Sequence, residues 1–192
     1  ALNFDPLANT DDGFCCGASL PIPNWTQIGS DIDGEAIDDN SGYSVSLSSD
    51  GNTVAIGAYG NDGNGSYSGH VRVYNYNGSS WTQLGNDIDG EAVDNEFGFR
   101  SSLSADGSIV AIGSKRNNAH HGHVEIYNWD GNSWTQLGND IDGEAQGDQS
   151  GTSVSLSSDG NIVAIGAQYN NGNGSSSGHV RVYIYNGSSW NQ

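Results

Sequence analysis

Basic residues are scarce in this sequence, and methionine is absent. Five Lys and Arg residues stand against 23 Asp and Glu residues, which gives a net charge of −18 at pH 7. A surface of this sign repels phosphate backbones and anionic lipid headgroups, so we expect no nucleic-acid partner. No stretch is apolar enough to span a bilayer, so we expect no direct membrane insertion. Because no Met is present at residue 1, we expect a processed chain or a fragment.

Cysteine is nearly absent too, and the only two residues, Cys15 and Cys16, are neighbours. Adjacent cysteines rarely bridge each other, because a disulfide needs more separated and suitably oriented Cα atoms. We therefore expect disulfide partners outside this chain. The alternative is a pair of reduced surface thiols, since the cellular compartment controls the state of thiols.

Turn-forming residues take the place of helix formers. Charged residues make up only 15% of the chain, whereas Gly alone occupies 29 positions. Few Lys and Glu residues, together with abundant Gly, Asn and Ser, favour many short strands over helices. The composition therefore predicts an all-β fold.

Most of the sequence is one segment repeated three times. The acidic stretch SDIDGEA at 30–36 returns as NDIDGEA at 86–92 and at 139–145. A three-residue deletion between Val110 and His123 shortens one loop of the second repeat, which indicates an exposed connector there. Tryptophan marks the period, at spacings of 56, 53 and 56 residues: Trp25, Trp81, Trp134 and Trp190.

Each period predicts four strands joined as an antiparallel meander. In the first repeat we expect them at 43–47, 53–58, 69–76 and 81–85, with a lone fourth strand before them at 24–29. Four-stranded sheets repeated at this period are typical of β-propeller blades. The predicted organisation is an Asp/Asn-rich segment over 1–23, then propeller repeats over 24–192, at about 24–80, 81–133 and 134–192.

Three blades are fewer than the roughly four that a closed propeller needs. We therefore expect either a longer parent protein with more repeats or several chains assembled into a ring or a stack.

One family carries the same motifs. FGFRSSLSADGSIVAIGS at 97–114, followed by HVEIY at 123–127, resembles the FG-GAP repeat, the blade unit of integrin α-chain propellers and of many bacterial surface and secreted proteins. The resemblance covers roughly residues 24 to 190 and implies a β-propeller at an extracellular or cell-surface location. The Phe-Gly pair is present only as Phe97-Gly98, because Ser41-Gly42 and Ser150-Gly151 replace it in the other repeats.

The resemblance also bears on calcium. Family members that bind calcium use an Asp-x-Asp-x-Asp-Gly loop between the first two strands. Here that loop is the tight turn SDGN at 49–52, and one carboxylate cannot supply the six or more oxygen ligands that calcium takes. We therefore predict that the calcium site of the family is absent.

The acidic segments are the other candidate calcium sites, and calcium is the one cofactor that the sequence indicates. Alternating carboxylates around a Gly could surround a hard cation, although the EF-hand spacing is missing. The competing interpretation makes each segment a linker between blades, with Ile32, Ile88 and Ile141 in the core. The candidate ligands are Asp31, Asp33, Glu35, Asp38, Asp87, Asp89, Glu91, Asp94, Asp140, Asp142, Glu144 and Asp148.

Two further sets of residues are candidate sites. NFDPLANTDDGFCC at 3–16 resembles the thrombospondin type 3 calcium repeats, which implies Asp5, Asn9, Asp11 and Asp12 as oxygen donors. Asn-x-Ser/Thr acceptor sequences could carry glycans on surface loops. They lie at Asn24, Asn64, Asn77, Asn173 and Asn186.

Repetition also bears on function. Catalysis normally uses one singular set of groups, whereas this chain consists of copies, so we predict that it is not an enzyme. The leading interpretation is a non-catalytic extracellular propeller module for adhesion or for the architecture of a surface fibre or matrix. The alternative is a lectin-like module in which Tyr59 and Tyr67 stack on a sugar. Expected partners are other protein subunits or surface glycans, in a homo-oligomer or within a longer chain.

Overall fold

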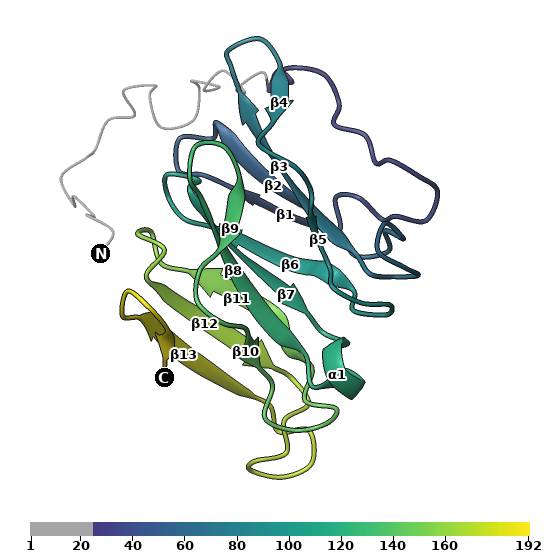
Figure 1. Cartoon of the computed structure of the whole chain (residues 1–192), viewed down its shortest axis with the longest axis vertical. Helices are drawn as coiled ribbons and strands as arrows, with labels where there is room; N and C mark the ends of the chain where they lie inside the picture. The colour runs from purple at the N-terminus through teal and green to yellow at the C-terminus, as the bar shows by residue number, and fades with distance from the viewer. Residues whose placement is uncertain (1–24) are drawn as a thin grey trace, which may run out of the picture.

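The computed structural model describes residues 25–192, which form three antiparallel sheets that follow one another in space (Figure 1). The predicted all-β fold with three four-stranded blades is confirmed. In the first blade the order is β1 (Ser44–Leu47), β2 (Thr53–Ala58), β3 (His70–Tyr76) and β4 (Trp81–Gln83), and β5 (Ile88–Asp89) also pairs with β3.

The second and third blades repeat this arrangement. The second comprises β6 (Phe97–Leu103), β7 (Ile109–Ser114), β8 (His123–Trp129) and β9 (Trp134–Gln136), and β10 (Ile141–Asp142) also pairs with β8. The third comprises β11 (Ser150–Leu156), β12 (Ile162–Ala167), β13 (His179–Tyr185) and β14 (Trp190–Asn191). In the shortened loop of the second blade the chain forms one helical turn, α1 (Asn117–His120).

The prediction of a lone strand over 24–29 is wrong for the described part, residues 25–29, which form no strand. The equivalent strands β4 and β9 pair with the third strands β3 and β8 of their own blades. A strand needs such a hydrogen-bonded neighbour, and none of the described strands pairs with residues 25–29. Residues 1–24, with the predicted sites Asp5, Asn9, Asp11, Asp12, Cys15, Cys16 and Asn24, lie outside the described residues.

The hydrophobic core lies between the blades. Between the first two blades, Val71 and Val73 of β3 pack with Leu103 of β6 and Ile112 of β7. The equivalent residues of the second and third blades form the next cluster, which includes Val124, Ile126, Val163 and Ile165. Each pair of neighbouring blades therefore buries the two faces that meet between them, as in repeat proteins.

Some glycines of the repeat lie where two blades touch. A Cβ atom on Gly57 of β2 would overlap the carbonyl oxygen of Gly98 in β6, and one on Gly113 would overlap that of Gly151. Ser46 Oγ accepts a hydrogen bond from the Leu103 amide (2.9 Å), and Ser102 Oγ accepts one from the Leu156 amide (3.0 Å). Gly and Ser thus allow the backbones of neighbouring blades to approach each other closely.

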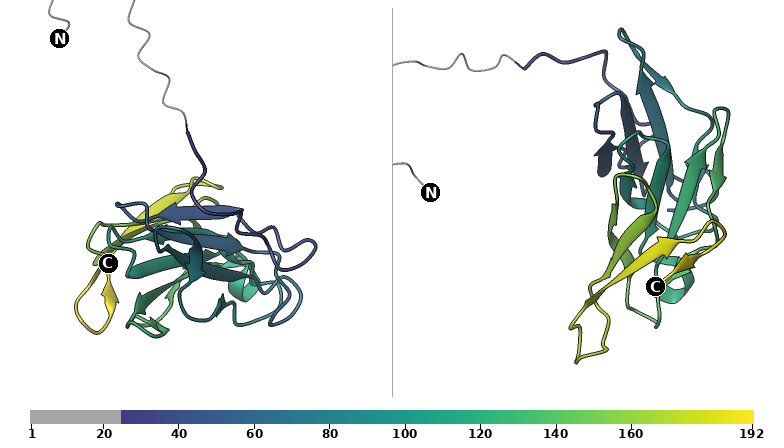
Figure 2. Two further views of the ribbon diagram at one scale, coloured as in Figure 1. Left: turned by 90° about the horizontal axis from the view of Figure 1, so that it is seen from above. Right: turned by 90° about the vertical axis from the view of Figure 1, so that its left-hand side faces the viewer.

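The row of blades has two ends. The first and third blades lie at its opposite ends (Figure 1 and the right-hand view of Figure 2). Only the middle blade is therefore covered on both faces by described residues.

Candidate functional site

The second and third acidic segments run between consecutive blades, and the first precedes the first blade. After β4 the chain turns back along β3, so that Asp89 pairs with His70 and Ile88 with Val71; β10 repeats this pairing on β8. Ile88 and Ile141 are buried in the core, whereas Ile32 is half-buried. The second and third segments therefore link the blades, as the linker interpretation predicts.

Within one segment the carboxylates have different partners. The first aspartate of each segment is held by the glutamine four residues earlier. Gln27 donates to Asp31 Oδ1 (2.8 Å), Gln83 to Asp87 Oδ1 (2.6 Å) and Gln136 to Asp140 Oδ1 (2.6 Å).

The glutamate of the first and third segments contacts an arginine instead. Glu35 Oε1 lies 3.4 Å from Arg72 Nη1, and Glu144 Oε1 lies 3.5 Å from Arg181 Nη1. Each arginine also donates to a backbone carbonyl of the same segment, that of Asp33 (2.8 Å) or Asp142 (2.6 Å). Arginine thus fastens the acidic segment to the third strand.

Asp148, the last candidate ligand of the third segment, does not occupy the position that Asp38 and Asp94 occupy in the first two segments. Asp38 and Asp94 have positive φ angles and occupy turn positions, where the third segment has Gly147. Asp148 corresponds instead to Asp39: each accepts a bond from a backbone amide three residues earlier and from a buried asparagine, Asn61 for Asp39 and Asn170 for Asp148. Asp148 is therefore a buried structural residue of the turn.

Two groups of side chains among residues 25–192 bring three possible metal ligands within 4.8 Å of one another. They are Glu35, His70 and Asp87 in the first blade, and His123, Glu125 and Asp140 in the second. Both groups combine a third strand with linker residues, and neither consists of the carboxylates of one segment alone. Grouping one segment's carboxylates around one ion therefore has no support among the described residues.

The two groups differ in charge. In the first blade, the Arg72 guanidinium lies beside the Glu35 carboxylate, and His70 Nδ1 lies 3.5 Å from Asp87 Oδ2. In the second blade Glu125 occupies the position of Arg72, and its Oε1 lies 3.0 Å from His123 Nε2. Tyr127 donates a 2.6 Å hydrogen bond to Glu125 Oε2.

The extra carboxylate changes the electrostatics around it. The negative charge of Glu125 raises the pKa of Glu91, and partial burial and Asp140 raise it further. Burial raises the pKa of Tyr127, and the Glu125 charge adds to this effect. Sequence reasoning overlooked His123 and Glu125 as ligands, although comparing HVRVY at 70–74 and 179–183 with HVEIY at 123–127 shows the exchanged charge.

The loops where the family's calcium loop would lie are tight turns. Asp50 accepts hydrogen bonds from the Ser48 hydroxyl (2.7 Å) and from the Asn52 amide (2.9 Å), and Asp106 and Asp159 do the same in the next blades. These carboxylates cap their own turns, since Asp and Asn side chains readily bond the backbone two residues on.

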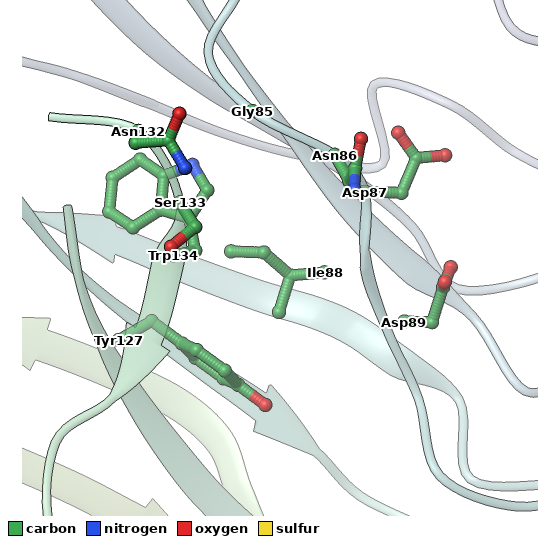
Figure 3. A pocket seen from close by; sticks show the side chains of 9 residues that line it. All are labelled: Gly85, Asn86, Asp87, Ile88, Asp89, Tyr127, Asn132, Ser133 and Trp134. Carbon is green, nitrogen blue, oxygen red and sulfur yellow. The ribbon is translucent and has the colours of Figure 1, made fainter. Parts of the chain in front are cut away.

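An open pocket of about 360 Å³ lies where the second acidic segment crosses the second blade (Figure 3). Ile88 projects toward the Tyr127 and Trp134 rings, and Asp87 and Asp89 lie on its other side. Equivalent pockets in the other blades are lined by Asp31, Asp33, Tyr74 and Trp81, and by Asp140, Asp142, Tyr183 and Trp190.

The two tyrosines predicted to stack on a sugar lie elsewhere. The Tyr59 ring packs against the Tyr43 ring at 4.6 Å between centroids, and against Phe99 at 5.9 Å. Tyr67 is exposed at a loop position with positive φ. The predicted glycan acceptors Asn64, Asn77, Asn173 and Asn186 are all exposed.

The outer faces of the first and third blades are open. Leu47 is 60% exposed, whereas its equivalent Leu103 is 7% exposed between blades. Val182 is 52% exposed, whereas its equivalent Val73 is 1% exposed. We call the first face, with Val45 and Leu47, the leading edge, and the second, with Val180 and Val182, the trailing edge.

Comparison with known proteins agrees with this architecture. Residues 30–74 and 141–185, in the first and third repeats, match the model of the FG-GAP repeat. Two segments of the chain therefore match the FG-GAP repeat, and the predicted resemblance is confirmed. No curated protein is significantly similar to it in sequence.

Solved structures are similar to parts of this chain at low sequence identity. A candidate 6-phosphogluconolactonase from Bacteroides uniformis has a TM-score of 0.56 at 14% identity, over 82% of this chain and 40% of that one. The β-propeller domain of the Trilobed protease from Pyrococcus furiosus has a TM-score of 0.46 at 10% identity, over 78% and 40%. This chain thus spans well under half of the structures it matches. No helix among the described residues is long and apolar enough to cross a membrane.

Proposed function

We propose that this chain is a non-catalytic extracellular propeller segment that serves adhesion or the architecture of a surface fibre or matrix. It does so by docking its leading and trailing edges onto further blades of the same kind. One observation carries the proposal: positions that are buried between the described blades are exposed at the two ends of the row.

The two edges are the two halves of one interface. The trailing edge presents Val180 and Val182 where the first blade presents Val71 and Val73 to its neighbour. The leading edge presents Leu47 where the second blade inserts Leu103. The edges differ from each other, so a contact between them is heterologous and joins copies head to tail, into a ring if the rotation closes.

Polar groups at the edges follow the same pattern. Ser155 is exposed at the trailing edge, whereas its equivalents Ser46 and Ser102 each accept an amide hydrogen bond from the next blade. A Cβ atom on Gly42 at the leading edge would meet nothing within 4 Å, whereas one on its equivalent Gly98 would overlap the carbonyl oxygen of His70 in the preceding blade. Both edges thus retain the features that permit close contact between blades.

The extracellular location and the non-catalytic role have support of their own. FG-GAP repeats are typical of extracellular proteins, and four Asn-x-Ser/Thr sequences lie on exposed loops. The contacts recur from blade to blade, whereas catalysis depends on one set of groups at one place.

The test is the association state of the 192-residue chain, measured by sedimentation velocity over a range of concentrations. We expect concentration-dependent association that either Leu47→Asp or Val182→Asp abolishes, because each places a charge in an apolar contact. Mixing the two variants should give a dimer and nothing larger, since each variant retains the edge that the other has lost.

Val93→Asp is the matched control. It adds the same charge at an exposed valine on a linker, so it should associate as the wild type does. A wild-type chain that stays monomeric at millimolar concentration, or equal association of all the variants, would contradict the proposal.

The lectin-like alternative has one observation in its favour, the pockets in which aspartates lie beside a Trp–Tyr pair. Aromatic faces and carboxylates are the groups that stack on sugars and accept bonds from their hydroxyls. A chain with Asp33→Asn, Asp89→Asn and Asp142→Asn should then lose binding on a glycan array, whereas Tyr67→Ala should retain it. Absence of glycan binding by the wild type would rule this alternative out.

A further inference from the structure

The second blade departs from the other two at the position of Glu125. The first and third blades have Arg72 and Arg181 there, and each contacts the glutamate of its acidic segment. Glu125 is 0% exposed, and its charge is opposite to that of the residue it replaces. Burying a carboxylate is costly unless a cation or several donors compensate for it.

The surroundings of Glu125 supply little compensation. Tyr127 donates to one carboxylate oxygen, but Oε1 has no hydrogen-bond partner among the described residues. Neither imidazole nitrogen of the fully buried His123 has one, although His123 Nε2 and Glu125 Oε1 lie 3.0 Å apart. The other charged groups nearby, Asp140 and Glu91, are carboxylates as well.

We propose that His123, Glu125 and Asp140 bind a divalent transition-metal cation of the zinc class, with Glu91 as a further ligand. Replacing an arginine by a glutamate lowers the local charge by two, and a divalent cation restores it. The ion takes the place of the guanidinium that joins the acidic segment to the third strand in the other blades.

Geometry and ligand chemistry favour zinc over calcium. Zinc accepts imidazole nitrogen and carboxylate oxygen at about 2.0 Å in tetrahedral sites, which puts neighbouring ligand atoms about 3.3 Å apart. The ligand atoms of the three residues all lie within 4.8 Å of one another, and the closest two are 3.0 Å apart. Calcium takes six to eight oxygen ligands and does not favour imidazole.

The decisive variant is Glu125→Arg, which gives the second blade the same residue as the others. Titration calorimetry with zinc chloride should show one more equivalent bound by the wild type than by this variant, or binding weakened by about 100-fold or more. Loss of an outer-shell partner alone costs about 10- to 100-fold, and here a ligand becomes a cation. Cys15, Cys16, His120 and His121 are the same in both chains, so the difference reports this site.

Two further variants complete the design. Glu125→Gln should also weaken zinc binding, and it covers the case in which the arginine variant does not fold. Asp31→Asn removes the carboxylate equivalent to Asp140 from the first segment. Asp31 belongs to neither group of possible ligands, so this variant should bind zinc as the wild type does. Circular dichroism verifies that each variant is folded.

The reverse exchange, of arginine for glutamate, tests in the first blade whether this position decides zinc binding. Arg72→Glu brings a third acidic ligand beside Glu35, His70 and Asp87, and the variant should gain one equivalent of zinc. Equal stoichiometry and affinity in the wild type and Glu125→Arg would overturn the proposal. Zinc binding only at millimolar concentration, or tighter binding of calcium than of zinc at this site, would overturn it as well.

Discussion

The indole nitrogen of Trp134 in β9 donates a 2.9 Å hydrogen bond to the backbone carbonyl oxygen of Leu84, which follows β4 of the preceding blade. Trp190 bonds to Leu137 in the same way (2.7 Å), and Trp81 bonds to Ile28 (3.1 Å). The repeated tryptophan therefore joins the outer strand of each blade to the segment of chain that precedes that blade.

We expect Trp134→Phe to lower the free energy of unfolding by about 1–3 kcal/mol, because it retains a ring and leaves the Leu84 carbonyl without its donor. Urea denaturation measures the difference. Trp25→Phe is the matched control: Trp25 is 93% exposed, so its replacement should change stability by less than about 0.5 kcal/mol. Equal effects at the two positions would mean that the bond between blades adds nothing.

Alanine substitutions at two glycines with similar backbone conformations distinguish the cost of backbone strain from the cost of a clash between blades. Gly42 has a φ of 86° and Gly98 a φ of 82°, so alanine is strained at both. Only at Gly98 would the new Cβ also overlap a neighbouring blade, at the His70 carbonyl. Gly42→Ala should therefore cost about 1–2 kcal/mol, the usual penalty of a left-handed conformation. Gly98→Ala should cost at least about 1 kcal/mol more, as overpacking does. Equal losses in thermal denaturation would contradict the close contact.

Acid should weaken the turns that aspartates cap. Hydrogen bonds from the Ser48 hydroxyl and the Asn52 amide lower the pKa of Asp50 to about 2. The pKa is lower in the folded chain than in the unfolded one, about 3.9. The ionised carboxylate thus stabilises the fold above about pH 4, and this contribution is lost as the pH falls toward about 2.

We expect Asp50→Ala to lower the melting temperature at pH 6, and the difference from the wild type to shrink as the pH falls below about 4. The same substitution at Asp159 should behave alike, since Ser157 and Asn161 lower the pKa of that carboxyl. A difference that stays constant from pH 6 to pH 2 would show that ionisation of Asp50 does not stabilise the turn.

Salt should promote association through the blade edges. Each copy carries a net charge of −18, so two copies repel each other at low ionic strength. Raising NaCl from about 0.05 M to about 0.5 M shortens the screening length and should lower the dissociation constant of the wild type. Sedimentation at the two salt concentrations measures this. Weaker association at high salt would indicate that attraction between opposite charges, not apolar contact, joins the copies.

The sequence by itself determined the repeat, the number of strands in each blade, the tight turns and the FG-GAP motif. These features are local, because alternating apolar residues and Asp-Gly or Gly-rich turns specify strands and hairpins over a few residues. The burial of β2 and the inward positions of Ile88 and Ile141 follow from the same pattern.

Only the tertiary structure decided which groups meet across blades. Asp140 reaches His123 because β10 runs back along β8, and residues 25–29 form no strand because no described strand pairs with them. The carboxylates of one acidic segment look alike in sequence, yet Asp31 accepts a hydrogen bond from Gln27, whereas Glu35 contacts Arg72 of β3. Such contacts depend on packing between segments that are far apart in the chain. The short-range periodicity of the sequence does not predict this packing. The same packing leaves Leu47 and Val182 exposed while their equivalents are buried.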